Sequence, residues 1–486
     1  MSSTRNFAII ALFAIPLAHS PARAQQPPTD TSQEHMHHHG NIQPVTPFYP
    51  RLGRAQESAQ GKLVNLDDAQ RLASQSNPTL RQAEAEIRAA KARRQQSSLY
   101  PNPTVGYTGD EIRGGSNNGG KQGFFLQQNI VTGGKLNKSA AVFDQETRLA
   151  EIEAEEQKLR VETAVKTAFY RVLAAQELLY ARRDLAQIEL NYAQTQRELF
   201  NTGQADESEV LEAEVDAQRQ RLSARMQENT LLEEWKSLAA VIGQPDLPSS
   251  TVAADLAHGW PDINEDQIIE VIAAQAPATR IADSAASRAA AEIARAKSQA
   301  IPDLQLRGGL QYNNEPIAPN VATGWEGLAE VAVEIPIFNR NQGNVAAASA
   351  DLDRAQLEKQ RIALTLRERT ATILDEYASA KLMALEYRDE ILPRSQKAYT
   401  LLNEKYGLML ASYPHVLQAQ RKLFQLQTEY IAALENIWTT GIALQGFLLT
   451  DGLEAPSRPG EIDRPIRETN LPIPERNTAF DPMPRP

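Results

Sequence analysis

Leu199-Phe-Asn-Thr-Gly-Gln-Ala-Asp-Glu-Ser-Glu-Val-Leu211 decides the fold of this chain, because it joins two long helical patterns. Gly203 is the only glycine between Gly134 and Gly243. A residue that tolerates positive φ, alone among helix-favouring residues, indicates a sharp reversal of the chain. The stretch therefore predicts the turn of a helical hairpin.

The arms of this predicted hairpin are long. From Lys135 to Phe200, apolar residues recur at steps of three, four and seven, which is typical of a coiled-coil seam. About 65 helical residues make a rod of roughly 95 Å. Asp206 or Ser208 suits the cap of the outgoing helix, which we expect to run from about Glu207 to Ile242.

The same order of features returns about 200 residues later, as a duplication requires. The matching pairs are Asn77-Pro78 with Ala276-Pro277, Tyr100-Pro101 with Ile301-Pro302, Phe200 with Tyr406, and Leu211 with Leu417. A second long helix is expected from Gly343 to about Tyr406, and a returning helix from about Pro414 to Leu449. The chain thus predicts two repeats of one architecture.

Each repeat also contains two segments with the alternation of β-strands. They are Thr104–Thr108, Gly123–Val131, Leu304–Tyr312 and Gly327–Ile335, with a polar loop expected at 313–324. Their length approaches that of a tilted transmembrane strand, but four strands are too few to close a barrel. The chain must therefore oligomerise to close one, and the strand count alone does not choose a trimer over a dimer or tetramer.

The ends of the chain differ from the repeats. Residues 1–24 read as a cleaved signal peptide, because Arg5 precedes the apolar run Phe7–Leu17 and Ala22-Arg-Ala24 suits cleavage. An uncleaved anchor is disfavoured, since this run is too short to span a bilayer. The expected divisions are a disordered Pro/Gln/His-rich segment at 25–60, repeat 1 at 61–250 (strands about 104–131, tip about 200–208), repeat 2 at 251–450 (strands about 303–337, tip about 406–414), and a disordered tail at 451–486.

Composition excludes several classes of function. The net charge is −11 without a basic cluster, which argues against a nucleic-acid partner. The chain has no cysteine, and this excludes disulfides, thiolate metal sites and a cysteine-linked lipid anchor. We find no catalytic constellation and no cofactor motif, so we expect a protein that is not an enzyme.

One short tract has metal-binding chemistry. It comprises His35, Met36, His37, His38 and His39. Imidazole and thioether groups suit copper, silver or zinc. A solvated polar linker or an expression artefact explains the same tract, and an unstructured segment supports weak capture at most.

The duplicated order of broken helix, proline-containing entry, strand pair, long helix, turn and return helix resembles the outer membrane factor family typified by TolC, over roughly residues 61–450. The motifs that carry the resemblance are Phe200-Asn-Thr-Gly203 with Val210-Leu211, and Tyr406-Gly with Val416-Leu-Gln-Ala419. Val333-Glu-Ile-Pro-Ile-Phe-Asn-Arg-Asn-Gln-Gly343 and Tyr406–Leu417 look most like the heavy-metal efflux branch represented by CusC and CzcC.

The resemblance implies a mainly α fold with membrane β-strands: a homotrimer with a 12-stranded barrel in the outer membrane and an α-helical tunnel in the periplasm. It also implies docking to a periplasmic adaptor (membrane fusion) protein and an inner-membrane RND-type pump.

The same resemblance makes the two turns, with Gly203 and Gly407, the periplasmic tips of the tunnel. Tyr406 matches a tyrosine of the family's closed entrance, and Glu209 matches its acidic partner on the first hairpin. Ala411 stands where the family relative has an arginine. The remaining candidate pore residues are Asp206, and His415 and Gln418, which stand where two aspartates are expected.

These observations predict a passive exit duct of a tripartite efflux system, with heavy-metal cations as cargo. The nearest alternative is the same duct for drugs or type I secretion. A soluble periplasmic coiled-coil tether explains the helices but not the paired strands. A metal-scavenging protein that uses the His tract is a third class.

Overall fold

A computed structural model describes residues 64–110, 112–114, 117–118, 120–318 and 321–454. All of them lie in a compact unit, Pro47–Pro486, and the other unit, Met1–Thr46, lies outside the described residues. The helices are α1 (Leu66–Ser76), α2 (Pro78–Ser97), α3 (Lys135–Asn201), α4 (Glu207–Ile242), α5 (Ile268–Gln275), α6 (Pro277–Ser298), α7 (Gln342–Glu386), the π-helix η2 (Tyr387–Ile391), α8 (Leu392–Gly407) and α9 (Tyr413–Gln445). The strands are β1 (Thr104–Asp110), β2 (Arg113–Gly114), β3 (Asn117–Asn118), β4 (Lys121–Ile130), β5 (Leu304–Ala318) and β6 (Val321–Val333).

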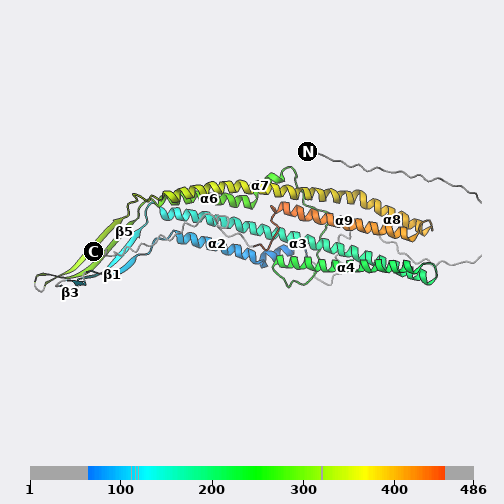
Figure 1. The fold of residues 1–486 in the computed structure, drawn as a ribbon, viewed down its shortest axis with the longest axis horizontal. Helices are drawn as coiled ribbons and strands as arrows, with labels where there is room; N and C mark the ends of the chain where they lie inside the picture. The colour runs from blue at the N-terminus through cyan, green and yellow to red at the C-terminus, as the bar shows by residue number, and fades with distance from the viewer. Residues whose placement is uncertain (1–63, 111, 115–116, 119, 319–320, 455–486) are drawn as a thin grey trace, which may run out of the picture. The chain divides into compact units, whose positions relative to one another are not determined.

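Two helical hairpins and one sheet position the rest of the chain. Helix α3 has 67 residues and α4 has 36, and the two pack along each other from the turn at Gly203. At 1.5 Å per residue α3 is about 100 Å long. Helices α8 and α9 form the second hairpin (Figure 1). The strands lie next to the N-terminal ends of α3 and α7, whereas the turns follow the C-terminal ends of α3 and α8. The sheet and the turns are therefore far apart.

The sheet joins the two repeats. Its order is β1-β4-β5-β6, with every neighbour antiparallel, and the two hairpins meet where Ile130 pairs with Leu304 and Lys121 pairs with Asn313. The predicted loop at 313–324 is wrong over most of its length, because β5 and β6 extend into it. Their ladder continues beyond Asn313 through register shifts around Pro316, which lacks the N–H that a regular ladder needs.

Proline and asparagine set the paired helix breaks. Pro78 occupies the first turn of α2, and Pro277 occupies the same place in α6. The buried Asn77 side chain accepts a hydrogen bond from the Thr79 N–H at 2.9 Å and donates one to the Val241 carbonyl at 2.7 Å. A single side chain thus caps α2 and ties it to the end of α4.

The predicted continuous helix from Gly343 to Tyr406 is interrupted at η2. Pro393 lies just after this π-helical turn, in the first turn of α8. Because proline has no N–H to donate to the carbonyl four residues earlier, the backbone there departs from α-helical pairing. Tyr387 within the turn donates a hydrogen bond to Glu429 Oε2 on α9 at 2.6 Å. The returning helix also ends earlier than predicted, at Gln445, since Phe447 and Leu448 adopt positive φ.

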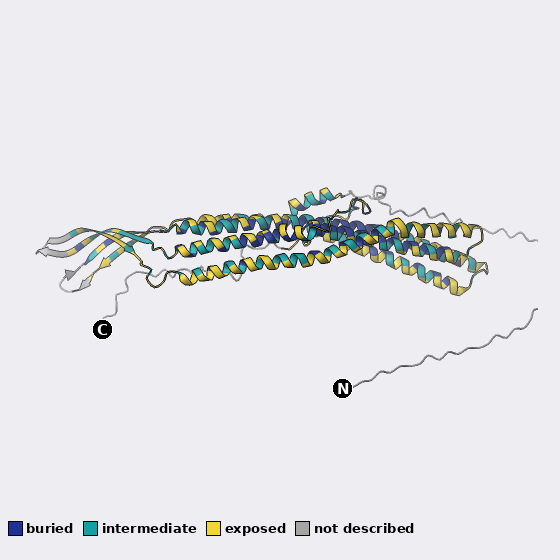
Figure 2. Cartoon of the chain, turned by 90° about the horizontal axis from the view of Figure 1, so that it is seen from above, coloured by how far each residue is buried: buried dark blue, intermediate teal, exposed yellow. Residues whose placement is uncertain are grey.

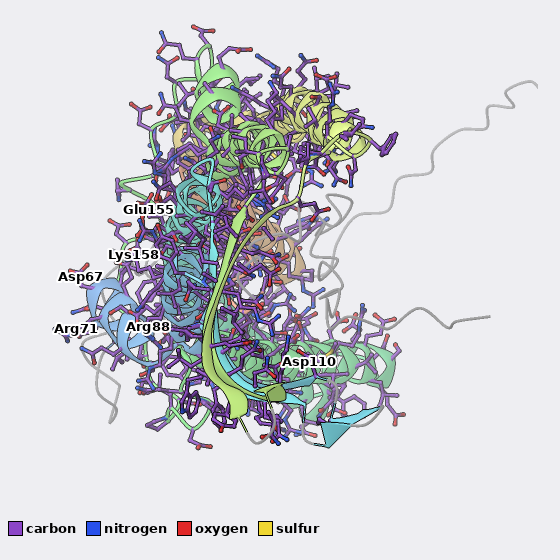
Figure 3. All side chains as sticks on the ribbon, turned by 90° about the vertical axis from the view of Figure 1, so that its left-hand side faces the viewer. Asp67, Arg71, Arg88, Asp110, Glu155 and Lys158 are labelled. Atoms are coloured by element: carbon purple, nitrogen blue, oxygen red, sulfur yellow. The ribbon has the colours of Figure 1, made fainter. Side chains whose placement is uncertain are left out.

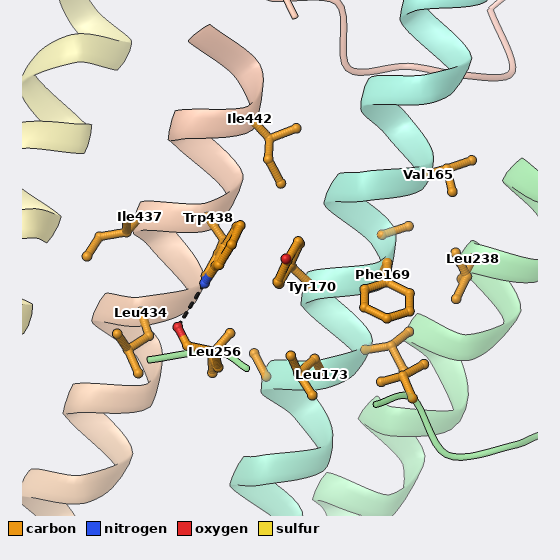
Figure 4. Packing of buried hydrophobic residues seen from close by; sticks show 14 of the residues in the cluster. Val165, Phe169, Tyr170, Leu173, Leu238, Leu256, Leu434, Ile437, Trp438 and Ile442 are labelled. Carbon is orange, nitrogen blue, oxygen red and sulfur yellow. Dashed lines mark hydrogen bonds between the residues drawn. The ribbon is translucent and has the colours of Figure 1, made fainter. Parts of the chain in front are cut away.

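The hydrophobic core gathers around the middle of α3 and the second half of α9 (Figure 2). Tyr170 stacks on Trp438 with ring centroids 3.7 Å apart, and Trp438 Nε1 donates to the Leu256 carbonyl at 2.8 Å (Figure 4). Burial raises the pKa of Tyr170 to about 12. The connecting segment that contains Leu256 therefore locks α9 onto α3.

Charged side chains cover the outside of the helices. Viewed from the sheet end in Figure 3, the exposed residues Asp67, Arg71, Arg88, Glu155 and Lys158 lie on the outer surface of α1, α2 and α3. No helix among the described residues is both long and apolar enough to cross a membrane.

Candidate functional site

The first turn has the hydrogen bonds of a left-handed helix cap. Gly203 has φ +76°, its N–H donates to the Phe200 carbonyl at 2.9 Å, and the Gln204 N–H donates to the Leu199 carbonyl at 2.8 Å. These are the two bonds that close a helix through a left-handed residue. Asp206, with extended backbone, precedes α4.

The second turn repeats this geometry 206 residues later. Met409 has φ +61°, its N–H donates to the Tyr406 carbonyl at 2.9 Å, and the Leu410 N–H donates to the Lys405 carbonyl at 2.8 Å. Ser412 precedes α9 with the same extended backbone as Asp206. Gly407 is the last residue of α8, and the left-handed position falls two residues later, on Met409, a side chain for which this backbone is strained. The duplication thus extends to individual backbone hydrogen bonds.

The candidate pore residues all lie at these turns. Asp206, Glu209, His415 and Gln418 are exposed, as are Gly203 and Gly407. The His415 ring Nδ1 lies 3.3 Å from Ser412 Oγ. Tyr406 contacts Tyr413, which stacks on Tyr192, and the Glu209 charge acts on Tyr192.

Three tyrosines connect the two hairpins. Tyr413 stacks on Tyr192 of α3 at 5.3 Å between ring centroids, and Tyr406 lies 5.5 Å from Tyr413. Burial, with the neighbouring tyrosines and Glu189, raises the pKa of Tyr413 to about 12. Burial also raises the pKa of Tyr192, and Glu209 adds to that shift through its negative charge. Sequence reasoning found Tyr406 but missed Tyr192 and Tyr413.

An ion cluster lies farther from the tips. Arg421 of α9 donates from Nε and Nη2 to the two carboxylate oxygens of Glu189 at 2.5 and 2.6 Å, and from Nη2 to Asp216 Oδ2 of α4 at 2.8 Å. The side chain of Glu189 is fully buried. The bidentate hydrogen bonds raise the pKa of Arg421 further above its ordinary value. This cluster, named here the Arg421 latch (Arg421, Glu189 and Asp216), ties α9 to both helices of the first hairpin.

The sequence contained a signal for the latch. Arg421 lies four residues after Leu417 and three before Phe424, which are both buried in one stripe of α9. Glu189 interrupts the α3 stripe between Leu185 and Tyr192 in the same way. A charge within an apolar stripe requires a buried partner.

No group of three or more His, Asp or Glu side chains that could hold a metal ion occurs in residues 64–454 where the structure describes them. The candidate ligands His35, Met36, His37, His38 and His39 lie outside the described residues.

Residues 70–244 match the family model described as outer membrane efflux protein. This segment of the chain is similar to the outer membrane efflux protein family. It is 22% identical over 404 residues to the cobalt-zinc-cadmium resistance protein CzcC of Cupriavidus metallidurans, a match that covers 83% of this chain and 93% of that protein. It is 26% identical over 292 residues to the pyoverdine export outer membrane protein OpmQ of Pseudomonas putida, covering 56% of this chain and 58% of that one.

Solved structures show the same fold. A crystal structure of CusC aligns with a TM-score of 0.64 at 17% identity, covering 82% of this chain and 96% of CusC. The open state of the Neisseria gonorrhoeae MtrE channel aligns with a TM-score of 0.63 at 16% identity, covering 80% of this chain and 90% of that one. The predicted fold class, long helical hairpins with four larger strands in a duplicated TolC-like chain, is confirmed.

The inter-hairpin tyrosines predict a pH dependence. Because the folded pKa of Tyr413 is raised from 10 to about 12, its contribution to hairpin docking is complete below pH 10 and is lost as pH rises toward 12. We expect hydrogen exchange at the ends of α8 and α9 to accelerate above pH 10 beyond the intrinsic pH effect. Tyr413→Phe should reduce this acceleration, since phenylalanine keeps the ring contact and cannot ionise. An identical pH response in both proteins would contradict it.

Proposed function

We propose that this protein is the exit duct of a tripartite efflux system, and that three copies form a 12-stranded outer-membrane barrel above a periplasmic helical tunnel. The duct conducts passively, and an inner-membrane pump with a periplasmic adaptor supplies energy and direction. The observation that carries the proposal is the duplication of the chain. Each repeat has a strand pair at one end and a helical turn at the other.

Unpaired surfaces support assembly with further copies. Within the described sheet, β1 and β6 each have one neighbour, so both edges present free backbone groups. An exposed apolar stripe also follows α4, and α7 with α8 carries a second set of exposed leucines. The first set is Leu211, Val215, Leu222 and Met226, and the second is Leu357, Leu364, Leu382 and Leu401. Apolar stripes of this kind are typical of helices that another helix covers.

Heavy-metal cations are the proposed cargo. The cobalt-zinc-cadmium resistance protein CzcC aligns over most of both chains. The export protein OpmQ favours a second candidate, an organic chelate such as a siderophore, but it covers little more than half of this chain. The His tract, proposed as a weak metal-binding segment, is not required for either cargo.

Deleting the gene tests the cargo. We expect the deletion strain to lose tolerance to at least one of cobalt, zinc, cadmium, copper or silver, and the full chain to restore it on expression in trans. A chain without residues 31–40 should restore tolerance as well, because the duct rather than the His tract carries the function. Unchanged metal tolerance in the deletion strain would contradict a metal cargo. If that strain also lost siderophore export, the result would support an organic chelate as the cargo.

We further propose that the turns of α3–α4 and α8–α9 form the periplasmic mouth. Asp206, Glu209, Tyr406, His415 and Gln418 line it, and the Arg421 latch with the tyrosine contacts keeps the second hairpin against the first. The support is geometric. Both turns have the same backbone hydrogen bonds, and near them Arg421 and Tyr413 of α9 contact side chains of α3 and α4. Release of these links would let the mouth widen.

A further inference from the structure

The two faces of the four-stranded sheet differ in chemistry. Residues that pair directly across a ladder share a face. One face is apolar and exposed, and its large side chains are Val105, Tyr107, Phe124, Leu126, Leu310, Trp325 and Val331. The other face carries the charged residues of the paired register, namely Asp110, Lys121, Arg307, Glu326 and Glu330. If the apolar face meets lipid, as the proposed barrel requires, the charged face lines the pore.

A flat aromatic element lies on this inner face. Phe125 pairs with Gly106 on β1 and with Gly309 on β5, so glycine flanks it on both sides. A Cβ at Gly106 would collide with the Phe125 ring, and one at Gly309 would lie 3.2 Å from Phe125 Cβ. The two glycines therefore leave room for the ring to lie along the wall instead of projecting into the lumen.

Arg307 rests on this ring. Its guanidinium carbon lies 4.0 Å from the Phe125 ring centroid, within cation–π range. Its Nη1 lies 3.8 Å from Glu330 Oε2, on the residue directly opposite in the β5–β6 ladder. The side chain is about a quarter exposed, less than that of Glu330. Ring and carboxylate together hold the positive charge against the wall and neutralise it.

The other charges on the inner face leave an excess of carboxylate. Lys121 lies opposite Asp110 in the register of the β1–β4 ladder, and its charge also acts on Glu326. Glu326 accepts hydrogen bonds from Asn313 Nδ2 at 2.8 Å and from Gln311 Nε2 at 3.2 Å, both of which are uncharged amides. The face thus holds three carboxylates, Asp110, Glu326 and Glu330, against the two cations Lys121 and Arg307. Glu326 is the carboxylate of this set that has no cation directly opposite it in the β5–β6 ladder.

We propose that the Phe125–Arg307–Glu330 set determines the ion preference of the strand-lined part of the pore. Phe125 and Glu330 keep the Arg307 charge away from the pore axis, so the carboxylate excess of this face dominates the local field and small hydrated cations pass in preference to anions. A lumen of one charge sign concentrates ions of the opposite sign. This inference rests on the proposed function, because it needs the sheet to close into a pore.

Reversal potentials in a KCl gradient across a planar bilayer test the proposal with the full-length purified protein. The wild type should prefer K⁺ to Cl⁻. Phe125→Ala and Glu330→Gln should each lower the permeability ratio about threefold, because a freed Arg307 side chain reaches into the lumen. The double variant Phe125→Ala with Arg307→Gln should restore the ratio to the wild-type value or above. A loss of wall structure alone would not be repaired by removing the arginine.

Matched controls lie beside each position. Phe124→Ala removes a neighbouring ring from the apolar face, and Glu334→Gln removes an exposed carboxylate just after β6. Both should leave the ratio unchanged. Conducting variants with an unaltered ratio, or a double variant that stays at the Phe125→Ala value, would overturn the inference. A wild-type protein that forms no pores would instead defeat the proposed function. If Phe125→Ala does not insert, Glu330→Gln alone decides the inference.

Discussion

Replacing Arg421 with alanine should raise the single-channel conductance of the protein in a planar bilayer, because it unlatches the proposed periplasmic mouth. Glu189 is fully buried and takes two of its hydrogen bonds from the Arg421 guanidinium. Removing one partner of a fully buried ion pair typically costs about 3–5 kcal/mol, since it leaves an uncompensated charge. The Arg421 side chain is 38% exposed, so the cost here should be smaller. Moving α9 away from α3 rehydrates that carboxylate. Each 1.4 kcal/mol is about a tenfold change in an equilibrium, so the open arrangement should become dominant.

Two further variants separate latch release from general damage. Lys422→Ala changes an exposed lysine next to Arg421 and should leave conductance unchanged. In the double variant Arg421→Ala with Glu189→Gln, the buried charge is absent, so the conductance should return most of the way to the wild-type value. Equal conductance in the wild type and the Arg421→Ala variant would show that the latch does not hold the mouth closed.

The latch also shows how far the sequence predicts this site. Both turns were predicted from two kinds of signal. Phe200, Gly203 and Tyr406 are local features of the sequence, and the 206-residue spacing relates the second turn to the first. The partners of Arg421 lie 232 and 205 residues away, on two other helices. Stripe interruptions at Glu189 and Arg421 indicate buried charges, but many pairings of such charges are compatible with one sequence. Only the relative placement of three helices selects among them.

The second turn makes the same point about conformation. Glycine is the usual residue at a left-handed position, and so Gly407 was the predicted turn residue. The structure has Met409 there, with φ +61°. Methionine at this φ is strained by roughly 1–2 kcal/mol, which the flanking helices must offset. The geometry of the duplicated hairpin therefore overrides the preference of glycine for the left-handed position.

The sequence predicted where the four larger strands lie, but it did not predict how far β5 and β6 extend. Alternation in Leu304–Tyr312 identified β5, yet the ladder with β6 continues to Ala318 and Val321. Asparagine, proline and glycine in 313–324 signal a loop when residues are read singly. In the sheet, Asn313, Pro316 and Ala318 of β5 pair with Gly324, Ala322 and Val321 of β6, and so the strands persist.

The largest stability effect is expected at Trp438. Its ring stacks on Tyr170 and its N–H is bonded to the Leu256 carbonyl, so one side chain joins α9, α3 and the connecting segment. Trp438→Ala should lower the free energy of unfolding by about 3–5 kcal/mol, the range for truncating a large buried aromatic residue. Trp438→Phe should cost less, because it keeps most of the ring contact and the Leu256 carbonyl still accepts a hydrogen bond from Trp260 Nε1 at 3.1 Å. The loss of one hydrogen bond of two costs about 0.5–1.5 kcal/mol. Phe338→Ala removes an aromatic ring that is 89% exposed and should change stability by less than about 0.5 kcal/mol. Thermal unfolding of the detergent-purified proteins should thus give melting temperatures in the order wild type and Phe338→Ala, then Trp438→Phe, then Trp438→Ala. A Trp438→Ala protein that melts with the wild type would mean that α9 is held to α3 mainly by the Arg421 latch and the tyrosines near the tips.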